Sequence, residues 1–278
     1  VEGGEQAVTL STEVRTVKGA GRSLTFDAVT GADGRTTIVV KGRIGIKAKA
    51  YDLRKRLHDP DLWTGDVLKA LLARRGITIG GEVTVTTDPL PTDSGASLAS
   101  ITSRTLPELL LDVNTWSNNF MAETVFKQMG CEPAVPCSWK LATERVTEVL
   151  RTRVGLPEES FEVVNGSGLY RATMISAAAM TQLLVHMAGD QRRAGAFLGS
   201  LAVSGRAGTL KRRLTSKWTR GKVKGKTGTL DEVVSLSGYV PYRGSTLAFS
   251  VLVNGATPER TGAIRRKIDR LVLSLAKR

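Results

Sequence analysis

The pattern of apolar and polar positions predicts strands at the beginning of the chain. Leu24 and Phe26 are separated by polar residues, as in a strand with one buried face. Asp33 and Gly34 form a hairpin turn signal, and the segment 37–46 then returns as a second strand. The first part of the chain is therefore predicted to be rich in β structure.

From residue 59 the pattern becomes helical. Asp59 can cap a helix that has Pro60 at its first position and that ends near Gly76. The apolar stripe of this helix comprises Leu62, Val67, Leu68, Leu71 and Leu72. Residues 82–87 predict a strand. The loop after that strand is marked by Pro89, Pro91 and Gly95.

Helices and then strands are predicted for the remainder. Helical patterns occur at 105–112, 117–129, 138–153, 176–188 and 208–215. Ser138 and Ser176 are suited to cap two of these helices. Three successive strands follow at 222–229, 233–240 and 247–253, and a final helix at 258–276. Strands at both ends with helices between them indicate a mixed α/β or α+β domain.

Composition narrows the class of protein. A chain of 278 residues with 41% apolar content can bury a sizeable core, and it contains no apolar run long enough to span a membrane. Its beginning lacks the pattern of a signal peptide, which is therefore absent, removed or outside the sequence. The net charge of +14 favours an anionic partner such as nucleic acid, acidic lipid or a cell-wall polymer, or else reflects solubility or genomic bias.

Cys131 and Cys137 are the two cysteines, and the two prolines among the five residues between them indicate a loop. This spacing suits a disulfide, which would imply an oxidising compartment, but two free thiols remain the alternative. One cysteine pair without a nearby histidine is too few ligands for a structural zinc site. His58 and His186 are isolated in the sequence. We therefore predict no bound metal, no cofactor and no Ser-His-Asp triad.

The first chemical motif is S-N-N at Ser117, Asn118 and Asn119. A serine and an asparagine two positions apart at a helix start can both point into one cleft. The hydroxyl can relay a proton, and the carboxamide can bind a substrate amide as donor and acceptor. Helix capping by Ser117 is the simpler interpretation of the same residues.

The second motif is K-T-G at Lys226, Thr227 and Gly228, on a predicted strand. The two-residue period of a strand places Thr227 and Thr229 on one face. Gly228 permits close approach of another backbone. Lys226 supplies a positive charge suited to a terminal carboxylate. The Thr229 N–H could form half of an oxyanion hole, which typically contributes about 3–4 kcal/mol to transition-state binding. A basic strand without catalytic function is the alternative.

Taken together, these motifs resemble those of the type-4 penicillin-binding proteins, the class C D-alanyl-D-alanine carboxypeptidases and endopeptidases. Penicillin-recognising serine enzymes carry S-x-x-K, S-x-N and K-T-G in this order. The match extends over most of residues 55–278. It includes S-N-N-F-M-A-E at 117–123, N-G-S-G-L-Y-R at 165–171, G-R-A-G-T-L at 205–210 and L-S-G-Y-V at 236–240.

The resemblance implies a penicillin-binding, serine β-lactamase-like transpeptidase fold, with mixed helices around an antiparallel sheet. Residues 1–50 would be the remainder of an inserted β-rich accessory domain, and residues 51–278 the catalytic domain. The family places its S-x-x-K nucleophile before this accessory domain, so that segment is expected to precede residue 1. The S-x-x-K at Ser274–Lys277 ends the last helix and is interpreted as coincidence.

The resemblance further implies a serine D-alanyl-D-alanine carboxypeptidase or endopeptidase. It would act on peptidoglycan stem peptides through an acyl-enzyme and would bind β-lactams when intact. Ser117 and Lys226 would relay protons, Asn119 would orient the peptide, and Thr227, Gly228 and Thr229 would bind substrate. The expected location is periplasmic or otherwise extracytoplasmic. Without its nucleophile segment the chain is expected to be an inactive piece, and that segment is a possible partner.

A second class of function remains open. The chain could be a catalytically dead relative, or a basic module that binds an anionic cell-wall polymer. Its basic stretch comprises Lys211, Arg212, Arg213, Lys217, Arg220, Lys222 and Lys224. Trp218 is the one aromatic residue there and no nucleic-acid motif surrounds it, so nucleic acid is not an expected partner. This stretch either attracts anionic glycan or peptide carboxylates, or is a solvated face.

Overall fold

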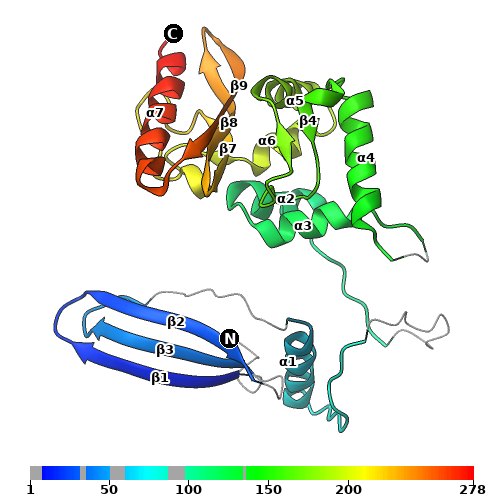
Figure 1. Cartoon of the computed structure of the whole chain (residues 1–278), viewed down its shortest axis with the longest axis vertical. Helices are drawn as coiled ribbons and strands as arrows, with labels where there is room; N and C mark the ends of the chain where they lie inside the picture. The colour runs from blue at the N-terminus through cyan, green and yellow to red at the C-terminus, as the bar shows by residue number, and fades with distance from the viewer. Residues whose placement is uncertain (1–7, 32–35, 51–59, 87–97, 134–135) are drawn as a thin grey trace. The chain divides into compact units, whose positions relative to one another are not determined.

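The computed structural model describes residues 8–31, 36–50, 60–86, 98–133 and 136–278 (Figure 1). The chain divides into two compact units, Val1–Leu98 and Ala99–Arg278. The two units are distinguished by their compactness, which says nothing of their functional roles. The assignment of 1–50 to an accessory domain and 51–278 to a catalytic domain therefore stays a prediction. Among the described residues, no helix is long and apolar enough to cross a membrane.

The N-terminal unit contains a three-stranded sheet in the order β1-β3-β2. β1 (Val8–Val17) runs parallel to β3 (Thr36–Gly45), and β2 (Arg22–Thr30) pairs with β3 in the antiparallel sense. The predicted β-rich beginning is therefore confirmed, while the turn signal at Asp33-Gly34 lies outside the described residues.

A helix completes the described part of this unit. α1 (Pro60–Arg74) begins at the predicted proline, and its predicted cap Asp59 lies outside the described residues. The helix ends where Gly76 adopts a φ of +79°, as expected. The predicted stripe is wrong at Leu68 and Leu71, which are 57% and 43% exposed, because the buried face of α1 centres on Ala70.

The strand predicted at 82–87 is also wrong over its described part. Residues 82–86 have no strand conformation, and no described strand pairs with them. A strand needs such a partner for its backbone hydrogen bonds. The predicted loop with Pro89, Pro91 and Gly95 lies outside the described residues.

The C-terminal unit is built on an antiparallel four-stranded sheet in the order β6-β7-β8-β9. Its strands are β6 (Ala202–Val203), β7 (Lys224–Leu230), β8 (Glu232–Tyr242) and β9 (Ser245–Ala256). The three long strands and the final helix α7 (Pro258–Ala276) confirm the predicted pattern. The protein thus has a mixed α+β fold, in which this sheet carries the core.

Both faces of β8 are covered. On one face Val234, Leu236 and Val240 belong to a core cluster with Ile268 and Val272 of α7. On the other face Tyr239 packs with Leu184 of α5 (Ala177–Gly189), and its hydroxyl donates a 2.7 Å hydrogen bond to the Leu184 carbonyl. Burial raises the pKa of Tyr239 to about 12. Helices α5 and α7 therefore enclose the sheet from its two sides (Figure 1).

The remaining helices form a second cluster beside the sheet. They are α2 (Leu106–Thr115), α3 (Asn119–Gln128), α4 (Trp139–Thr152) and α6 (Ala194–Ser200). Ser138 and Ser176 cap α4 and α5, as predicted. Two single turns, η1 (Glu158–Ser160) and η2 (Gly208–Leu210), and a small pair of strands, β4 (Phe161–Glu162) and β5 (Met174–Ile175), complete the unit.

The helix predicted at 208–215 is wrong, and α6 was not predicted. Only the short turn η2 forms there, because Gly208 and Leu214 have positive φ values of 63° and 52° that interrupt a right-handed helix. α6 has only seven residues, too few for a clear apolar period.

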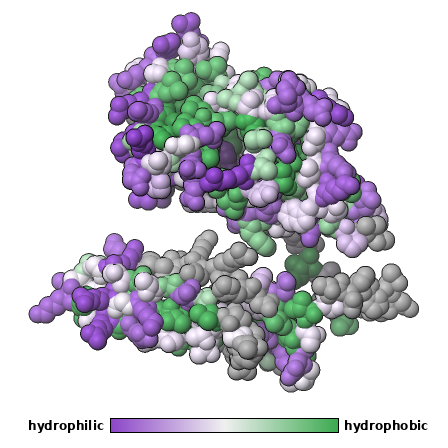
Figure 2. Space-filling model, in the orientation of Figure 1, coloured by the Kyte–Doolittle hydropathy of each residue, from purple (hydrophilic) through white to green (hydrophobic). Residues whose placement is uncertain are grey.

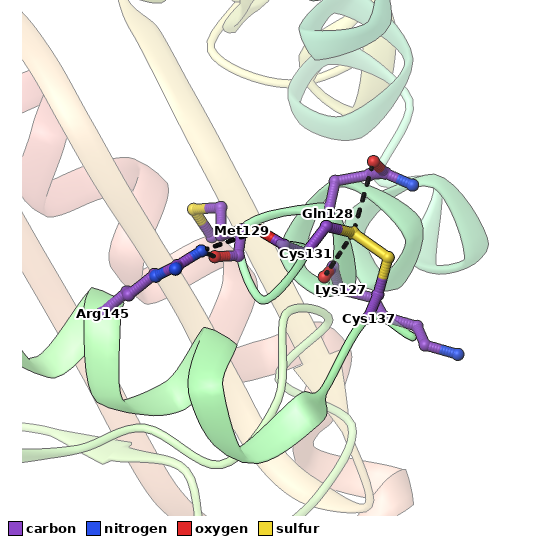
Figure 3. Close-up of a disulfide and its surroundings, with 6 residues drawn as sticks. All are labelled: Lys127, Gln128, Met129, Cys131, Cys137 and Arg145. Atoms are coloured by element: carbon purple, nitrogen blue, oxygen red, sulfur yellow. Dashed lines mark hydrogen bonds between the residues drawn. A yellow bond between two sulfur atoms is a disulfide. The ribbon is translucent and has the colours of Figure 1, made fainter. Parts of the chain in front are cut away.

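Cys131 and Cys137 form a disulfide between α3 and α4 (Figure 3). Arg145 of α4 fixes one side of this loop by donating hydrogen bonds to the carbonyls of Met129 and Cys131, at 2.7 and 3.1 Å. Its guanidinium also pairs with Glu132 at 2.8 Å. Among the described residues, no cluster of His, Cys, Asp and Glu could hold a metal ion.

Candidate active site

The K-T-G residues lie on β7, at the side of the sheet away from β9. Lys226 is opposite Ser237 of β8, and Gly228 is opposite Ser235. β6 pairs with β7 only at Lys224 and Gly225. From Lys226 onward this edge of β7 therefore has no strand partner among the described residues, and its backbone groups can accept an extended ligand.

Ser117 lies in the short connection between α2 and α3. It has a φ of 58°, which is uncommon for a residue other than glycine. The alternative interpretation, in which Ser117 caps the helix, is wrong, since Asn118 caps α3 by accepting a 3.0 Å hydrogen bond from the Met121 N–H. The left-handed backbone frees the Ser117 hydroxyl from capping and leaves it available for another partner.

That partner is Lys226. Its ammonium group donates a 2.7 Å hydrogen bond to Ser117 Oγ and a 2.9 Å hydrogen bond to the Thr227 carbonyl. Burial lowers the pKa of Lys226, because the charged form loses hydration. Two residues that are 109 positions apart in the sequence thus meet through a hydroxyl and a partly desolvated amine.

Two hydrogen bonds hold the end of α2, which precedes Ser117. Thr115 Oγ1 donates to the Ser200 carbonyl at 2.5 Å, and Asn114 Nδ2 donates to Ser200 Oγ at 2.8 Å. Gly208 packs so closely on Thr115 that an added Cβ would overlap the Thr115 carbonyl. The position of Ser117 therefore depends on contacts with α6 and the turn η2.

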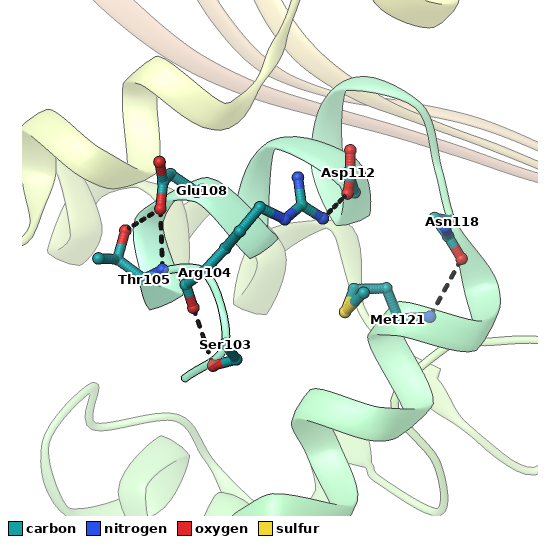
Figure 4. Close-up of polar contacts among 7 residues, drawn as sticks. All are labelled: Ser103, Arg104, Thr105, Glu108, Asp112, Asn118 and Met121. Carbon is teal, nitrogen blue, oxygen red and sulfur yellow. Dashed lines mark hydrogen bonds and ion pairs between the residues drawn. The ribbon is translucent and has the colours of Figure 1, made fainter. Parts of the chain in front are cut away.

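The start of α2 and its junction with α3 are also fixed by polar contacts (Figure 4). The Glu108 carboxylate accepts hydrogen bonds from the Thr105 N–H and hydroxyl at 2.8 and 2.7 Å, and these bonds lower the pKa of Glu108. Arg104 pairs with the Asp112 side chain, while the Asp112 carbonyl accepts from the Asn118 N–H at 3.1 Å. Asp112 thus links the beginning of α2 to the turn that contains Ser117.

Glu123 of α3 anchors the loop that follows β4. Its carboxylate accepts from Asn165 Nδ2 at 2.9 Å, from the Gly166 N–H at 3.2 Å and from the Ser167 N–H at 3.0 Å. A Cβ at Gly166 would overlap Phe126 and the Ala122 carbonyl. The S-N-N-F-M-A-E and N-G-S-G-L-Y-R segments are therefore one interlocked unit.

The far end of β7 is surrounded by polar side chains. Arg265 of α7 donates to Thr229 Oγ1 at 2.8 Å, and the Thr229 hydroxyl donates to the Gly228 carbonyl at 2.8 Å. Arg171 pairs with Glu232 at 3.2 Å. An open cavity of about 460 Å³ lies here and is lined by residues that include Thr229, Glu232 and Thr261.

The structure brings some of the predicted site residues together and leaves others apart. Ser117 and Lys226 touch, and Thr227 and Gly228 follow on the same strand. Asn119 is exposed at the first position of α3, and the Thr229 hydroxyl is engaged with Arg265. The close neighbour of Gly228 is the Ser235 side chain rather than a backbone.

Several supporting residues could not be inferred from sequence. Glu123, Arg265 and Glu232 act through partners that are distant along the chain, and no local pattern marks those contacts. Ser274 donates to the Leu271 carbonyl at the end of α7 and has no contact with Ser117 or Lys226. The catalytic and substrate-binding roles of the predicted residues stay predictions.

This arrangement is chemically suited to proton relay beside a bound peptide. Lys226 can hold the Ser117 hydroxyl in one orientation while that hydroxyl passes a proton to a neighbouring group. The free edge of β7 offers backbone hydrogen bonds to an extended substrate.

Comparison with known proteins gives one consistent result. The model of the family described as D-Ala-D-Ala carboxypeptidase 3 (S13) matches residues 3–275. The D-alanyl-D-alanine carboxypeptidase of Actinomadura sp. (strain R39) is 32% identical over 246 residues, which are 87% of this chain and 45% of that protein. The D-alanyl-D-alanine carboxypeptidase DacB of Haemophilus influenzae is 27% identical over 238 residues, 84% of this chain and 48% of that protein.

The fold is similar to a solved structure. Penicillin binding protein 4 (dacB) from Haemophilus influenzae, complexed with a β-lactam, superposes with a TM-score of 0.71 at 24% identity. The superposition covers 94% of this chain and 63% of that one. This similarity bears out the expected penicillin-binding fold. The chain spans slightly less than half the length of the two curated relatives.

Proposed function

Because the chain belongs to the D-Ala-D-Ala carboxypeptidase 3 (S13) family, we propose that it forms part of a serine D-alanyl-D-alanine carboxypeptidase or endopeptidase. Its substrate would be a peptidoglycan stem peptide that ends in two D-alanines. The observation that carries the proposal is the 2.7 Å hydrogen bond from Lys226 to Ser117, which joins two family motifs in one site.

Each predicted residue has a role in this proposal. A serine attacks the carbonyl between the two D-alanines, and the resulting acyl-enzyme is hydrolysed by water. The Ser117 hydroxyl relays a proton to the leaving amine, and Lys226 orients that hydroxyl. Asn119 binds the peptide amide, while Thr227 and Thr229 bind the terminal carboxylate. The N–H of Thr229 stabilises the developing oxyanion.

We propose that the attacking serine belongs to an S-x-x-K segment outside this sequence. Ser117 has Phe120 three positions later instead of a lysine. The hydroxyl of Ser274 is bonded to its own helix, away from Lys226. Trp116 and Phe120, which lie on either side of Ser117 in the sequence, are 63% and 78% exposed, which supports an additional segment packed near Ser117. The curated relatives, about twice as long, have room for one.

We further propose an extracytoplasmic location, periplasmic in a cell that has an outer membrane. The disulfide between Cys131 and Cys137 supports it, because such bonds persist in oxidising compartments. β-Lactams would acylate the same serine as the peptide substrate.

Labelling with fluorescent penicillin tests this function. The 278-residue chain alone should form no stable covalent adduct. A longer protein in which an S-x-x-K segment precedes residue 1 should be labelled on that serine, as located by peptide mapping after a denaturing gel. A label on any serine within residues 1–278 would contradict the proposed position of the nucleophile.

Variants of the longer protein test the roles of the two motifs. Lys226→Ala and Ser117→Ala should each slow acylation by about 10²-fold or more, since a positioned proton-transfer group contributes at least this much. The matched control is Lys140→Ala, which removes an exposed lysine of α4 and should leave the acylation rate unchanged. Equal rates in Lys226→Ala and Lys140→Ala would refute the proposed relay.

A further inference from the structure

A long segment of the C-terminal unit lacks acidic residues. No Asp or Glu occurs between Asp190 and Asp231. The Lys and Arg residues of this segment are Arg192, Arg193, Arg206, Lys211, Arg212, Arg213, Lys217, Arg220, Lys222, Lys224 and Lys226. Within the described residues, only Arg193 and Arg213 of this set form ion pairs, with Asp190 and Asp269. Most of the positive charge of the segment is therefore uncompensated.

One cation of this segment, Lys222, lines a hollow in the surface together with cations from later in the chain. An open cavity of about 300 Å³ lies where the loop before β7 meets the β8–β9 turn and the end of α7. Its lining includes Trp218, Lys222, Tyr242, Arg243, Lys277 and Arg278, and no acidic residue. Lys222 and Arg243 are exposed, and neither forms an ion pair in the described part of the chain.

Two aromatic rings in the lining of the cavity each lie beside a cation. The Lys217 ammonium is 5.3 Å from the Trp218 ring centroid, and the Arg243 guanidinium is 5.2 Å from that of Tyr242. Such contacts keep each cation beside a ring at the mouth of the cavity. Trp218 remains 42% exposed, which leaves apolar surface for the C–H groups of a ligand.

The cavity is separate from the candidate active site. Tyr242 lies five positions along β8 from Ser237, the residue opposite Lys226. That distance corresponds to about 16 Å of strand. Neither Ser117 nor Lys226 lines the cavity. A ligand bound there would not need to occupy the proposed peptide site.

We propose that this cavity binds phosphate groups of an anionic polyol-phosphate or sugar-phosphate polymer of the cell envelope. Lys222 and Arg243 donate to the phosphate oxygens, and Trp218 packs against the carbon skeleton between phosphates. Exposed cations of the preceding loop, Lys211 and Arg212, add long-range attraction. The polymer would hold the protein at the cell wall while the substrate site remains open.

A nucleic acid is the less suitable polyanion. The Cys131–Cys137 disulfide indicates an oxidising compartment, where nucleic acid is not an ordinary partner. The lining of the cavity contains two aromatic residues, Trp218 and Tyr242, whereas proteins that bind single strands stack successive bases on a row of aromatic side chains.

Binding of a fluorescein-labelled poly(glycerol phosphate) to the 278-residue chain tests the proposal by fluorescence anisotropy. Affinity should fall as ionic strength rises, and neutral dextran should not compete. The variant K222Q/R243Q should weaken binding by about tenfold. The control R151Q/R153Q removes the same charge from exposed arginines at the end of α4, and should change affinity by less than about twofold.

An equal loss of affinity in K222Q/R243Q and R151Q/R153Q would overturn the proposal, because net charge alone would then explain binding. The proposal would also be overturned by a single-stranded oligonucleotide that binds the parent chain more tightly than the polymer does and that loses affinity for K222Q/R243Q. That result would assign the cavity to nucleic acid. Hydrogen exchange of the unaltered chain gives a check that does not depend on variant folding. The polymer should protect amides in 215–222 and 240–245, and protection elsewhere only would refute the site.

Discussion

The two units of the molecule bury their sheets to very different extents. In the C-terminal unit β8 is covered on both faces, and side chains such as Leu236 and Val240 are fully buried. In the described part of the N-terminal unit the buried apolar residues are Ala28 and Ala70, while Leu10 and Val29 are 64% and 52% exposed. The free energy of burial is therefore concentrated in the unit that holds Ser117 and Lys226.

This difference explains where a desolvated lysine can exist. The sheet and helices of the C-terminal unit bury Lys226, and this burial lowers its pKa. The cost of burying an ammonium group must be offset by hydrogen bonds, which Lys226 makes to Ser117 Oγ and the Thr227 carbonyl. The N-terminal sheet has no comparable interior among its described residues, and the side chain of Lys41 on β3 is 52% exposed.

The largest expected effect comes from truncating one leucine in each unit. Leu236→Ala should reduce the free energy of unfolding of the C-terminal unit by about 3 kcal/mol, because it leaves a cavity in a packed core. The matched change Leu10→Ala should alter the stability of the N-terminal unit by less than about 0.5 kcal/mol. Denaturant titration followed by hydrogen exchange of each unit measures both. Similar losses of unfolding free energy in the two units would contradict the expected difference in burial between them.

A smaller effect is expected from the disulfide. The bond between Cys131 and Cys137 closes a loop with a separation of six residues. Replacing both cysteines by serine should lower the stability of the C-terminal unit by about 2 kcal/mol, since the unfolded chain regains loop entropy. The exchange rates of the N-terminal unit serve as the internal control. Reductant should lower the stability of the parent protein and leave the stability of the variant unchanged.

Tyr239→Phe tests the contact between sheet and α5. The change removes the hydrogen bond from the Tyr239 hydroxyl to the Leu184 carbonyl and should cost about 1 kcal/mol. It should also change the pH dependence. The raised pKa means that, between the ordinary tyrosine value and about 12, the unfolded chain releases the phenolic proton while the folded protein retains it. Stability of the parent should therefore fall through this pH range, and the Tyr239 contribution should be absent from the variant.

The smallest expected difference concerns the backbone of Ser117. Ser117→Ala keeps a side chain at positive φ, whereas Ser117→Gly relieves that strain. The glycine variant should be more stable than the alanine variant by about 1 kcal/mol, although both lose the hydroxyl. Thermal unfolding compares them directly. Equal melting temperatures would show that the left-handed conformation carries no measurable cost.

Local pattern predicted the elements whose residues are neighbours in the sequence. The final helix and the strands β7 to β9 follow from their own apolar periods and were located closely. The parallel pairing of β1 with β3 depends on contacts between distant segments, which no period encodes. The expected strand at 82–87 failed for the same reason, because alternation alone does not provide a partner.

The residues of the candidate site also fall into two groups, those that a local motif identifies and those that depend on distant contacts. The S-x-N and K-T-G motifs identified Ser117 and Lys226, and their contact is the central geometric finding. The conformation of Ser117 was missed because S-N-N at a helix start also fits ordinary capping. Glu123 was missed because its partners at 165–167 are about 43 positions away and are recognised only through the folded chain.

The conformation of Ser117 also bears on how this position can change over generations. Its backbone geometry favours glycine or asparagine, while the proposed relay requires a hydroxyl. Selection for folding and selection for catalysis therefore act in opposite directions on a single codon. A laboratory evolution experiment that rewards only thermal resistance should replace Ser117 early, whereas a parallel selection that also requires activity should keep serine despite the strain.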